Sequence, residues 1–369
     1  MNLVELCLSP DKGGLELYML RVVRWLARSS AHVFAVVAPG GELGSLLREQ
    51  GLPHRRLRVA VPWLPLSAAR RLARWIDEES VDVIHLHWAK DLNLAVLARR
   101  FAQRPVRIVY TRQMAITRSK HDWYHRALYR EVDFVLVITR RLQEEARRFL
   151  PLPPERVQLL YHGVPAPLSP PDNECAELRD RTGIPRGRFV VGLFGRIEPA
   201  KGQHVLVDAV ALLAQRDCHV HAVLFGHPMH PRHLRTLHEQ IARLGLGERV
   251  RHYGFHPQPQ AIMGCFDCVV LTTYNETFGL VLVEAMRAGV AVIGTDAGGV
   301  PEIIDDGATG LLVPPRNATA LADAIERLAR DADLRRRLAS AGKASADARF
   351  NEDQHFARLA AWLQPAAEA

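Results

Sequence analysis

The chain has 369 residues, of which 48% are hydrophobic and 24% are charged, a balance typical of a globular protein with room for two domain cores. No apolar run approaches the roughly 18 residues that a membrane-spanning helix needs, and the N-terminus lacks a basic stretch followed by an apolar signal core. The composition therefore predicts a cytoplasmic protein and excludes an extensively disordered one.

The net charge of +8 is concentrated in the first half of the chain. Residues 1–160 carry 26 Lys and Arg against 16 Asp and Glu, a net of +10, whereas the remainder carries 22 against 24, a net of −2. Such a half attracts an anionic membrane surface or nucleic acid. Its cations are interleaved with tryptophans, namely Trp25, Trp63, Trp75 and Trp123. We favour a membrane surface, and solvated helix faces in an arginine-rich chain remain the alternative.

The five cysteines are odd in number and scattered, which predicts reduced thiols rather than a secreted disulfide framework. Cys265 and Cys268 have the C-x-x-C spacing of redox and metal sites. No second pair of this kind and no nearby His pair completes a zinc set. We therefore interpret both as packing residues in front of a strand.

Apolar runs of strand length alternate with helical stretches in both halves, the pattern of doubly wound parallel sheets. In the first half, strands are expected at 4–8, 33–38, 83–86, 106–110 and 134–137, and helices at 15–27, 68–79 and 92–102. Seven prolines in 151–171 predict a connection between domains. In the second half, strands are expected at 189–194, 219–225, 250–253, 269–271, 291–294 and 310–313.

These patterns predict an α/β protein with two Rossmann-like, doubly wound domains that face each other across a cleft. The predicted domains are residues 1–165 and 166–350, and residues 351–369 are expected to form a terminal helix that packs back toward the first domain. Ligands of open parallel sheets bind outside the carboxyl ends of the strands, so we expect the site in the cleft.

Two carboxylates eight positions apart follow one of these strands. Glu276 lies in the loop after the expected strand 268–272, and Glu284 lies on the helix that begins near Phe278 and Gly279. A helix N-terminus offers unpaired N–H donors to an anion or a sugar hydroxyl, and glycine permits close approach of a ligand. Glu284 has mostly apolar neighbours, where an ionised carboxylate is costly unless it is bound. The alternative is a helix-terminal charge and a solvated helix residue.

Four segments in this order resemble motifs of the retaining nucleotide-sugar glycosyltransferases of family 4, which have the GT-B fold. They are 195–202 with the spacing G-R-x4-K-G, 276–284 with E-x7-E, 295–302 and 306–314. The resemblance covers about half of the chain specifically, and the first half matches more loosely. It implies a hexosyltransferase (EC 2.4) that needs no metal and no other cofactor.

The resemblance also implies a role for each matching residue. Arg196 and Lys201, which follow Gly195, would stabilise the leaving pyrophosphate, and Glu276 would bind hydroxyls of the donor sugar. Glu284 would bind the ribose hydroxyls. Backbone donors of the helix start and a glycine loop after the first strand would complete the donor site, namely Phe278, Gly279, Leu280, Gly13 and Gly14.

One position departs from the family pattern. The family has a histidine in a Thr-x-His arrangement after a strand, and this chain has Gln113 in its place. Glutamine can bind a sugar hydroxyl but cannot titrate, so a general-acid or general-base role at this position is in doubt. We expect an altered rate or donor choice rather than loss of transfer.

Two further features raise the question of a metal. His85 and His87 end a strand in the first half and have no visible third ligand, so we expect them on the acceptor side, with packing as the alternative. Asp331-Ala332-Asp333 has the D-x-D spelling of metal-dependent glycosyltransferases, but it precedes a helical run rather than following a core strand. We expect no metal site.

The sequence thus predicts transfer of a hexose or related sugar from a nucleotide-diphosphate sugar to a saccharide or lipid-linked acceptor. Cell-surface polysaccharide or lipopolysaccharide synthesis is the expected setting, with the protein peripheral on the inner face of the cell membrane and no nucleic-acid partner. Two alternatives remain. One is a nucleotide-sugar epimerase of the same fold, and the other is a sugar-nucleotide-binding protein whose activity is reduced by Gln113.

Overall fold

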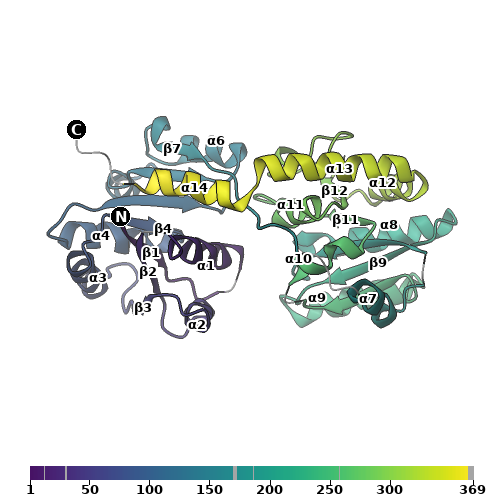
Figure 1. Ribbon diagram of the computed structural model, residues 1–369, viewed down its shortest axis with the longest axis horizontal. Helices are drawn as coiled ribbons and strands as arrows, with labels where there is room; N and C mark the ends of the chain where they lie inside the picture. Colours follow the sequence, from purple (N-terminus) through teal and green to yellow (C-terminus); the bar gives the residue numbers. More distant parts are fainter. Residues whose placement is uncertain (12, 30, 169–172, 186, 257, 365–369) are drawn as a thin grey trace. The chain divides into compact units, whose positions relative to one another are not determined.

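The computed structural model describes all residues except 12, 30, 169–172, 186, 257 and 365–369. The chain divides into two compact units, and each is an α/β domain (Figure 1). The first unit comprises Met1–Tyr161 and the terminal segment from Asp353, and the second comprises His162–Glu352. The division therefore falls four residues before the boundary expected at 165, and the return to the first unit falls two residues after 351.

The first unit contains a parallel sheet of seven strands in the order β3-β2-β1-β4-β5-β6-β7. The order reverses direction between the neighbouring strands β1 and β4, and such a switch point positions a ligand site at the carboxyl ends of the strands. The strands are β1 (Asn2–Cys7), β2 (His32–Val37), β3 (His54–Arg56), β4 (Val83–Leu86), β5 (Arg107–Arg112), β6 (Phe134–Val137) and β7 (Val157–Leu159).

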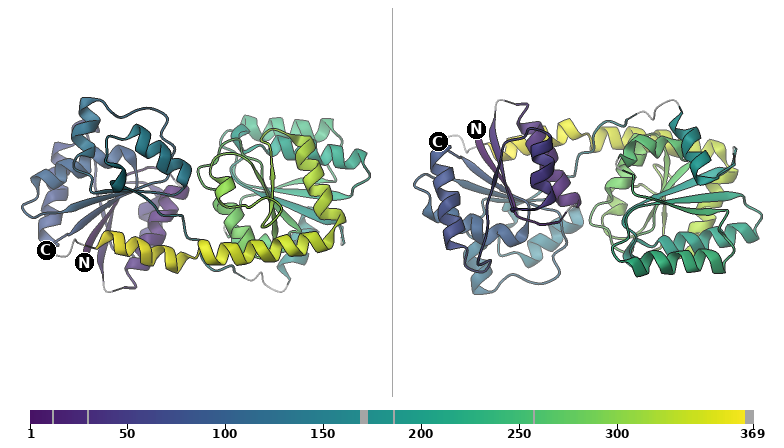
Figure 2. Two further views of the ribbon diagram at one scale, coloured as in Figure 1. Left: turned by 90° about the horizontal axis from the view of Figure 1, so that it is seen from above. Right: turned by 90° about the horizontal axis from the view of Figure 1, so that it is seen from below.

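Helices cover both faces of this sheet (Figure 2). They are α1 (Gly14–Leu26), α2 (Glu42–Glu49), α3 (Leu66–Glu78), α4 (Leu92–Phe101), α5 (Trp123–Tyr129) and α6 (Arg140–Phe149), with single 3₁₀ turns η1 (Ala89–Asp91) and η2 (Pro154–Arg156). The terminal helix α14 (Glu352–Leu363) lies beside α1, where its apolar face, with Phe356, Leu359 and Leu363, joins the core formed by α1 and the strands.

Two strands of this sheet, β3 and β7, are absent from the sequence-based expectation. Each has three residues, and β3 has the sequence His-Arg-Arg, which carries no apolar signal. β7 falls inside the proline-rich stretch that we interpreted as a connection between domains, so part of that stretch belongs to the first sheet. Both strands lie at the edges of the sheet, where a short and polar strand needs only one neighbour for pairing.

The second unit contains a parallel sheet of six strands in the order β10-β9-β8-β11-β12-β13, with the switch point between β8 and β11. Its strands are β8 (Phe189–Phe194), β9 (Val220–Phe225), β10 (Val250–Gly254), β11 (Cys268–Leu271), β12 (Ala291–Thr295) and β13 (Leu311–Val313). Its helices are α7 (Glu174–Thr182), α8 (Gln203–Gln215), α9 (Pro231–Arg243), α10 (Pro259–Ile262), α11 (Leu280–Arg287), α12 (Ala318–Arg330) and α13 (Ala332–Arg349), with η3 (Pro199–Lys201), η4 (Met263–Cys265) and η5 (Val300–Glu302).

The cysteines correct one expectation. Cys175 on α7 and Cys265 on η4 form a disulfide, with 5.1 Å between their Cα atoms, although 90 positions separate them in the chain. The expectation of reduced thiols is therefore wrong for this pair. The fold brings together two segments that are distant in the chain, and the spacing of the cysteines in the sequence does not reveal this contact. Cys7, Cys218 and Cys268 are free and buried, so Cys268 is a packing residue as expected.

Candidate active site

The motifs of the second half meet at the switch point of the second unit. The G-R-x4-K-G segment is the loop after β8 together with η3, and the E-x7-E segment is the loop after β11 together with α11. Since β8 and β11 are neighbours in a parallel sheet, both loops leave it at the same edge. This is the location at which open parallel sheets bind ligands.

Lys201 and Glu276 form an ion pair across these two loops. The Lys201 Nζ lies 2.6 Å from the Glu276 Oε2, and each side chain is about one-fifth exposed. The proposed phosphate cation and the proposed sugar-binding carboxylate thus neutralise each other, a contact that the sequence did not reveal. Both groups remain accessible from solvent, so a ligand can reach them without unfolding of the loops.

Hydrogen bonds to backbone carbonyls of the first loop hold the two loops together. The Thr272 Oγ1 donates to the Lys201 carbonyl over 2.8 Å, and the Tyr274 N–H donates to the Ala200 carbonyl over 3.0 Å. Gly202 has a φ of +69°, and a Cβ there would lie 2.1 Å from the Thr272 carbonyl oxygen. Only glycine fits so close to a neighbouring backbone, which explains the glycine that ends the first motif.

A second glycine positions Glu276. Gly298 has a φ of +65°, and a Cβ there would lie 2.0 Å from the Glu276 carbonyl oxygen. The next residue, Gly299, donates its N–H to that same oxygen over 2.7 Å. The segment after β12 therefore supports the Glu276 loop from beneath.

The predicted cation Arg196 lies at the open side of the first loop. More than half of its side chain is exposed, and its nearest acidic partner is Glu198, at 3.5 Å. The backbone around it is fixed, because Gly195 donates to the Phe225 carbonyl over 2.9 Å and the buried Gln203 donates to the Arg196 carbonyl over 2.7 Å. The guanidinium is free to turn toward a phosphate while its backbone stays in place.

Helix α11 begins at Leu280, with Gly279 as the preceding residue in a left-handed conformation of φ +109°. The Phe278 side chain is buried and packs edge-on against Phe350 with 5.6 Å between ring centroids. Further along the helix, Glu284 is partly buried and accepts a hydrogen bond of 2.9 Å from the Gln260 Nε2 on α10. Gln260 was not predicted from the sequence.

The glycine loop of the first unit is also as predicted in position, at the carboxyl end of β1. Gly13 precedes α1, and its N–H donates to the Glu16 Oε2 over 2.9 Å. Asp91, at the start of α4, accepts the Leu8 N–H over 2.7 Å, and burial raises the pKa of this carboxyl to about 7. Neither acid was predicted to support this loop.

Gln113 follows β5 at the same edge of the first sheet. Its side chain is buried, and its Nε2 has no hydrogen-bond partner within the described part of the protein. A buried amide donor without a partner is costly, and a ligand hydroxyl would satisfy it.

His85 and His87 lie beneath this edge rather than on it. Both imidazoles are buried, and both bond to the Glu5 Oε2 on β1, with 2.8 Å from the His85 Nδ1 and 2.7 Å from the His87 Nε2. The His85 Nε2 also bonds to the Thr111 Oγ1 over 2.7 Å. The predicted position on the acceptor side therefore gains no support here, because the histidines complete a buried polar cluster.

Burial and neighbouring groups shift the pKa values of Glu5, His87 and His355. Burial alone would raise the pKa of Glu5, but the two histidines lower it to about 2. Burial and the neighbouring His85 lower the pKa of His87 to about 4, although Glu5 opposes that shift. His355 on α14 bonds to the Tyr18 hydroxyl over 2.9 Å, and burial lowers its pKa to about 3.

Glu5 is the third side chain with a metal-ligating atom beside the histidine pair, and the ligating atoms of the three side chains lie within 4.8 Å of one another. Tetrahedral zinc with bonds of about 2.0–2.1 Å would hold them about 3.3 Å apart. In the structure the two imidazoles instead bond directly to Glu5, so zinc would require these atoms to move apart, and the absence of a metal site stays a prediction. In the D-x-D segment, Asp331 caps α13 by accepting the Leu334 N–H over 2.8 Å, and Asp333 pairs with Arg336.

Two family models match the chain. "Glycosyltransferase Family 4" matches residues 12–166, and "Glycosyl transferases group 1" matches residues 175–345. A D-inositol 3-phosphate glycosyltransferase of Corynebacterium glutamicum is 33% identical over 364 residues, which are 89% of this chain and 86% of that protein. An alpha-D-kanosaminyltransferase of Streptomyces kanamyceticus is 35% identical over 59% of this chain, and the match spans 56% of that protein.

Among solved structures, Anabaena HepE in complex with UDP superposes with a TM-score of 0.86 at 27% identity, covering 98% of this chain and 99% of that one. Its similarity extends over both units, as does that of the Corynebacterium relative. The chain is therefore a member of glycosyltransferase family 4, a glycosyl-transferring enzyme with the two-domain GT-B fold.

Proposed function

We propose that the enzyme transfers a hexose or related sugar from a nucleotide-diphosphate sugar, with retention of anomeric configuration, to a saccharide or lipid-linked acceptor. The observation that carries the proposal is the 2.6 Å contact between Lys201 and Glu276 at the switch point of the second sheet. It joins a cation for the diphosphate to a carboxylate for the sugar.

The charge requirement of the reaction matches these groups. As the bond to the sugar breaks, negative charge grows on the departing diphosphate and positive charge grows on the sugar ring. Lys201 and Arg196 would stabilise the diphosphate, the first as a point charge and the second through a forked guanidinium. Glu276, released from Lys201 by the incoming phosphate, would accept hydrogen bonds from sugar hydroxyls.

The rest of the donor follows from the elements around this pair. Glu284, held by Gln260, would bind the two ribose hydroxyls, and the backbone from Phe278 to Leu280 would donate to the sugar or phosphate. Gly13 and Gly14 would also bind the donor, and the Gln113 amide would donate to a sugar hydroxyl. Anabaena HepE was solved with UDP, which makes uracil the first base to test.

The mechanism needs no side-chain base at Gln113. In front-face transfer the acceptor hydroxyl attacks from the side on which the diphosphate leaves, so the anomeric configuration is retained. The leaving phosphate itself accepts the proton of that hydroxyl. Because Lys201 and Arg196 already supply the positive charge, we propose that transfer requires no divalent cation. An epimerase of the same fold would need titratable groups around the sugar, and Gln113 cannot supply one.

We further propose that the acceptor belongs to cell-surface polysaccharide or lipopolysaccharide synthesis and is presented at the inner face of the cell membrane. The protein would then be a peripheral one. Within the described residues no helix has the length and apolarity to cross a bilayer. The surplus positive charge of the first half would favour an anionic surface.

Thermal unfolding with UDP, GDP, ADP and their sugars in the presence of EDTA tests the donor site. A ligand that binds only the folded state raises the unfolding temperature. At a free ligand concentration of 100 times Kd, the free energy of unfolding rises by about 2.7 kcal/mol. We expect one nucleotide series to stabilise the wild type and the control Glu239→Ala, which removes an exposed acid of α9, but not Glu284→Ala. Stabilisation of all three proteins alike, or of none, would contradict the proposal. Release of free nucleotide only when an acceptor is present separates transfer from epimerisation.

A further inference from the structure

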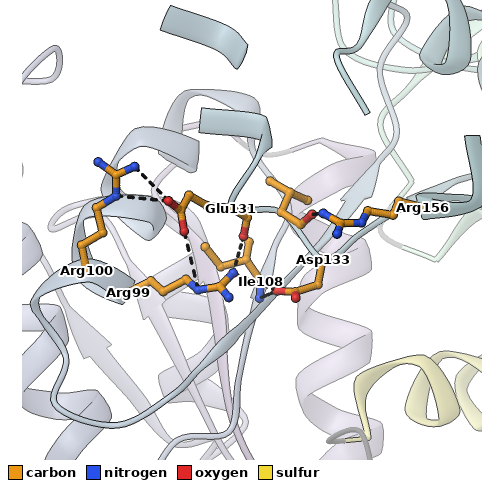
Figure 3. A network of polar contacts seen from close by, with 7 residues as sticks. Arg99, Arg100, Ile108, Glu131, Asp133 and Arg156 are labelled. Atoms are coloured by element: carbon orange, nitrogen blue, oxygen red, sulfur yellow. Dashed lines mark hydrogen bonds and ion pairs between the residues drawn. The ribbon is translucent and has the colours of Figure 1, made fainter. Parts of the chain in front are cut away.

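The cations of the first unit fall into a paired and an unpaired group. Figure 3 shows the paired group, in which Arg99 lies 3.0 Å from Asp133 and Arg100 lies 2.8 Å from Glu131. Arg104 and Arg55 are paired in the same way, with Asp82 and Glu79 respectively. Acids of neighbouring segments therefore neutralise the two cations of α4, together with Arg55 on β3 and Arg104 after α4. The positive surplus must lie elsewhere in the unit.

Much of it lies in residues 112–130, which comprise the end of β5, the loop after it and α5. This segment has five Lys and Arg against one acid, a net charge of +4. The acid, Asp122, is already engaged, because it caps α5 and lies 2.6 Å from the His125 Nδ1. Arg118 and Lys120 make no ion pair with any described residue. The pKa of Lys120 is lowered by partial burial and by the charges of Arg118 and Arg112, as expected where cations crowd without acids.

The same segment exposes large apolar side chains. Trp123 is 82% exposed, Met114 61% and Tyr124 39%, and the Trp123 and Tyr124 rings meet edge-on with centroids 6.0 Å apart. Most large apolar side chains of the unit are buried in its core. Indole and phenol rings have an apolar body and a polar edge, which suits the headgroup region of a bilayer.

The segment is held in place by the rest of the unit. The Lys120 N–H donates to the Phe149 carbonyl over 2.8 Å, and the Ile116 N–H donates to the Glu145 Oε2 over 3.1 Å, so α6 supports it at two points. The Arg126 Nε on α5 donates to the carbonyl of His121 in the preceding loop over 2.6 Å. The exposed rings and cations are therefore presented on an ordered backbone, which reduces the entropy lost when a surface binds.

We propose that residues 114–130 are the element through which the enzyme contacts an anionic lipid bilayer, with Trp123, Tyr124 and Met114 at headgroup depth and Arg118 and Lys120 on lipid phosphates. The inference rests on the part of the proposed function that places the acceptor at a membrane. It goes further in naming one segment, in place of the whole basic half, and in stating that the paired cations Arg55, Arg99, Arg100 and Arg104 take little part.

Sedimentation with vesicles tests this assignment on the full chain. The vesicles contain phosphatidylcholine alone, or the same lipid with 30% phosphatidylglycerol. Each Lys or Arg near an anionic surface contributes about fivefold in partition coefficient at low salt. Arg118→Gln/Lys120→Gln should therefore weaken binding to the anionic vesicles about 25-fold, and Trp123→Ala should weaken it several-fold. The matched control Arg232→Gln/Arg235→Gln removes the same charge from α9 and should bind as the wild type does.

Three results would overturn the inference. The first is that the wild type fails to bind anionic vesicles, and the second is that it binds neutral and anionic vesicles equally well. The third result is that the α9 control loses as much binding to anionic vesicles as Arg118→Gln/Lys120→Gln does. Nucleotide stabilisation is measured on each variant in the same preparations. Because Arg118, Lys120 and Trp123 are not among the residues proposed to bind the donor, that stabilisation should stay unchanged. Failure of vesicle binding with intact nucleotide binding would reject the membrane segment alone, whereas loss of nucleotide binding in the wild type would reject the proposed donor site.

Discussion

Lys201 and Glu276 lie 75 positions apart in the chain, and their side chains meet at 2.6 Å over the carboxyl ends of β8 and β11. The pair is partly exposed, so it contributes at most about 1 kcal/mol to folding. Its geometry is set by backbone contacts of the two loops and by the glycines packed against them. The pair therefore adds little to stability, although its position is fixed by the surrounding backbone. Such a pair can open to bind a ligand without destabilising the fold.

The first prediction concerns the cation of this pair. Lys201→Met removes the point charge beside the leaving diphosphate, and we expect kcat/KM to fall at least about 100-fold, as for loss of a preorganised charge-stabilising donor. The free energy of unfolding should change by no more than about 1 kcal/mol. Steady-state kinetics and urea unfolding check the two halves of this statement. A variant with near-normal kinetics would show that Lys201 does not serve the reaction.

The second prediction uses two glycines that share a left-handed backbone but differ in surroundings. Gly298→Ala places a methyl group against the Glu276 carbonyl, whereas Gly307, with a φ of +70°, has open space around its Cβ position. Gly307→Ala should cost about 1 kcal/mol from backbone strain alone. Gly298→Ala should cost about 3 kcal/mol, because the methyl group also overpacks against the Glu276 carbonyl, and should raise KM for the donor, because Glu276 must move. Equal effects of the two substitutions on both quantities would disprove the supporting role of Gly298.

The third prediction concerns Gln113, whose amide donor is unsatisfied in the described structure. If it binds a sugar hydroxyl, Gln113→Ala should lower kcat/KM about tenfold, as expected for one hydrogen bond in a buried site. Gln113→His should keep most of the activity and add an ionisation near pH 6.5 to the pH profile. Unchanged kinetics of both variants on the true substrates would remove Gln113 from the site.

The architecture and the donor loops could be predicted from the sequence because they depend on local signals. Apolar runs such as Phe134–Val137 are continuous, and the start of α11 after Gly279 follows from helix periodicity and glycine. Contacts between distant segments could not be predicted. The partner of His85 and His87 is Glu5, some 80 positions earlier, and only the parallel register of β1 with β4 brings it opposite. The same limit explains the Cys175–Cys265 disulfide and the contact of Gln260 with Glu284.

The fourth prediction follows from the buried histidines. The pKa of His355 is lowered to about 3, below the ordinary value of 6.5, so the unfolded chain binds its proton first as the pH falls. Stability from this group is complete above pH 6.5 and is lost toward pH 3, at about 1.4 kcal/mol per pH unit. Urea midpoints at pH 7.5 and 5.0 should therefore differ less in His355→Gln than in the wild type. An identical pH dependence would show that His355 is not buried as a neutral imidazole.

The fifth prediction concerns the disulfide between α7 and η4. Closing a loop of 90 residues restricts the unfolded chain, so reduction should lower the free energy of unfolding by about 2–4 kcal/mol. Cys175→Ser should reproduce the loss without reductant and should show no further loss when reductant is added. A wild type whose unfolding is insensitive to reductant would indicate free thiols at both positions.

The measurement that tests the central claim most directly is calorimetric titration of UDP and of a UDP-sugar into the wild type, Lys201→Met and Glu276→Gln, without metal. The account assigns the diphosphate to Lys201 and the sugar to Glu276. Lys201→Met should therefore lose affinity for both ligands, at least about tenfold for loss of a charged hydrogen bond. Glu276→Gln should bind UDP as the wild type does, or more tightly because Lys201 is released, and should lose the added affinity for the sugar. Equal weakening of both ligands by both substitutions, or no effect of either, would contradict the assignment of the pair.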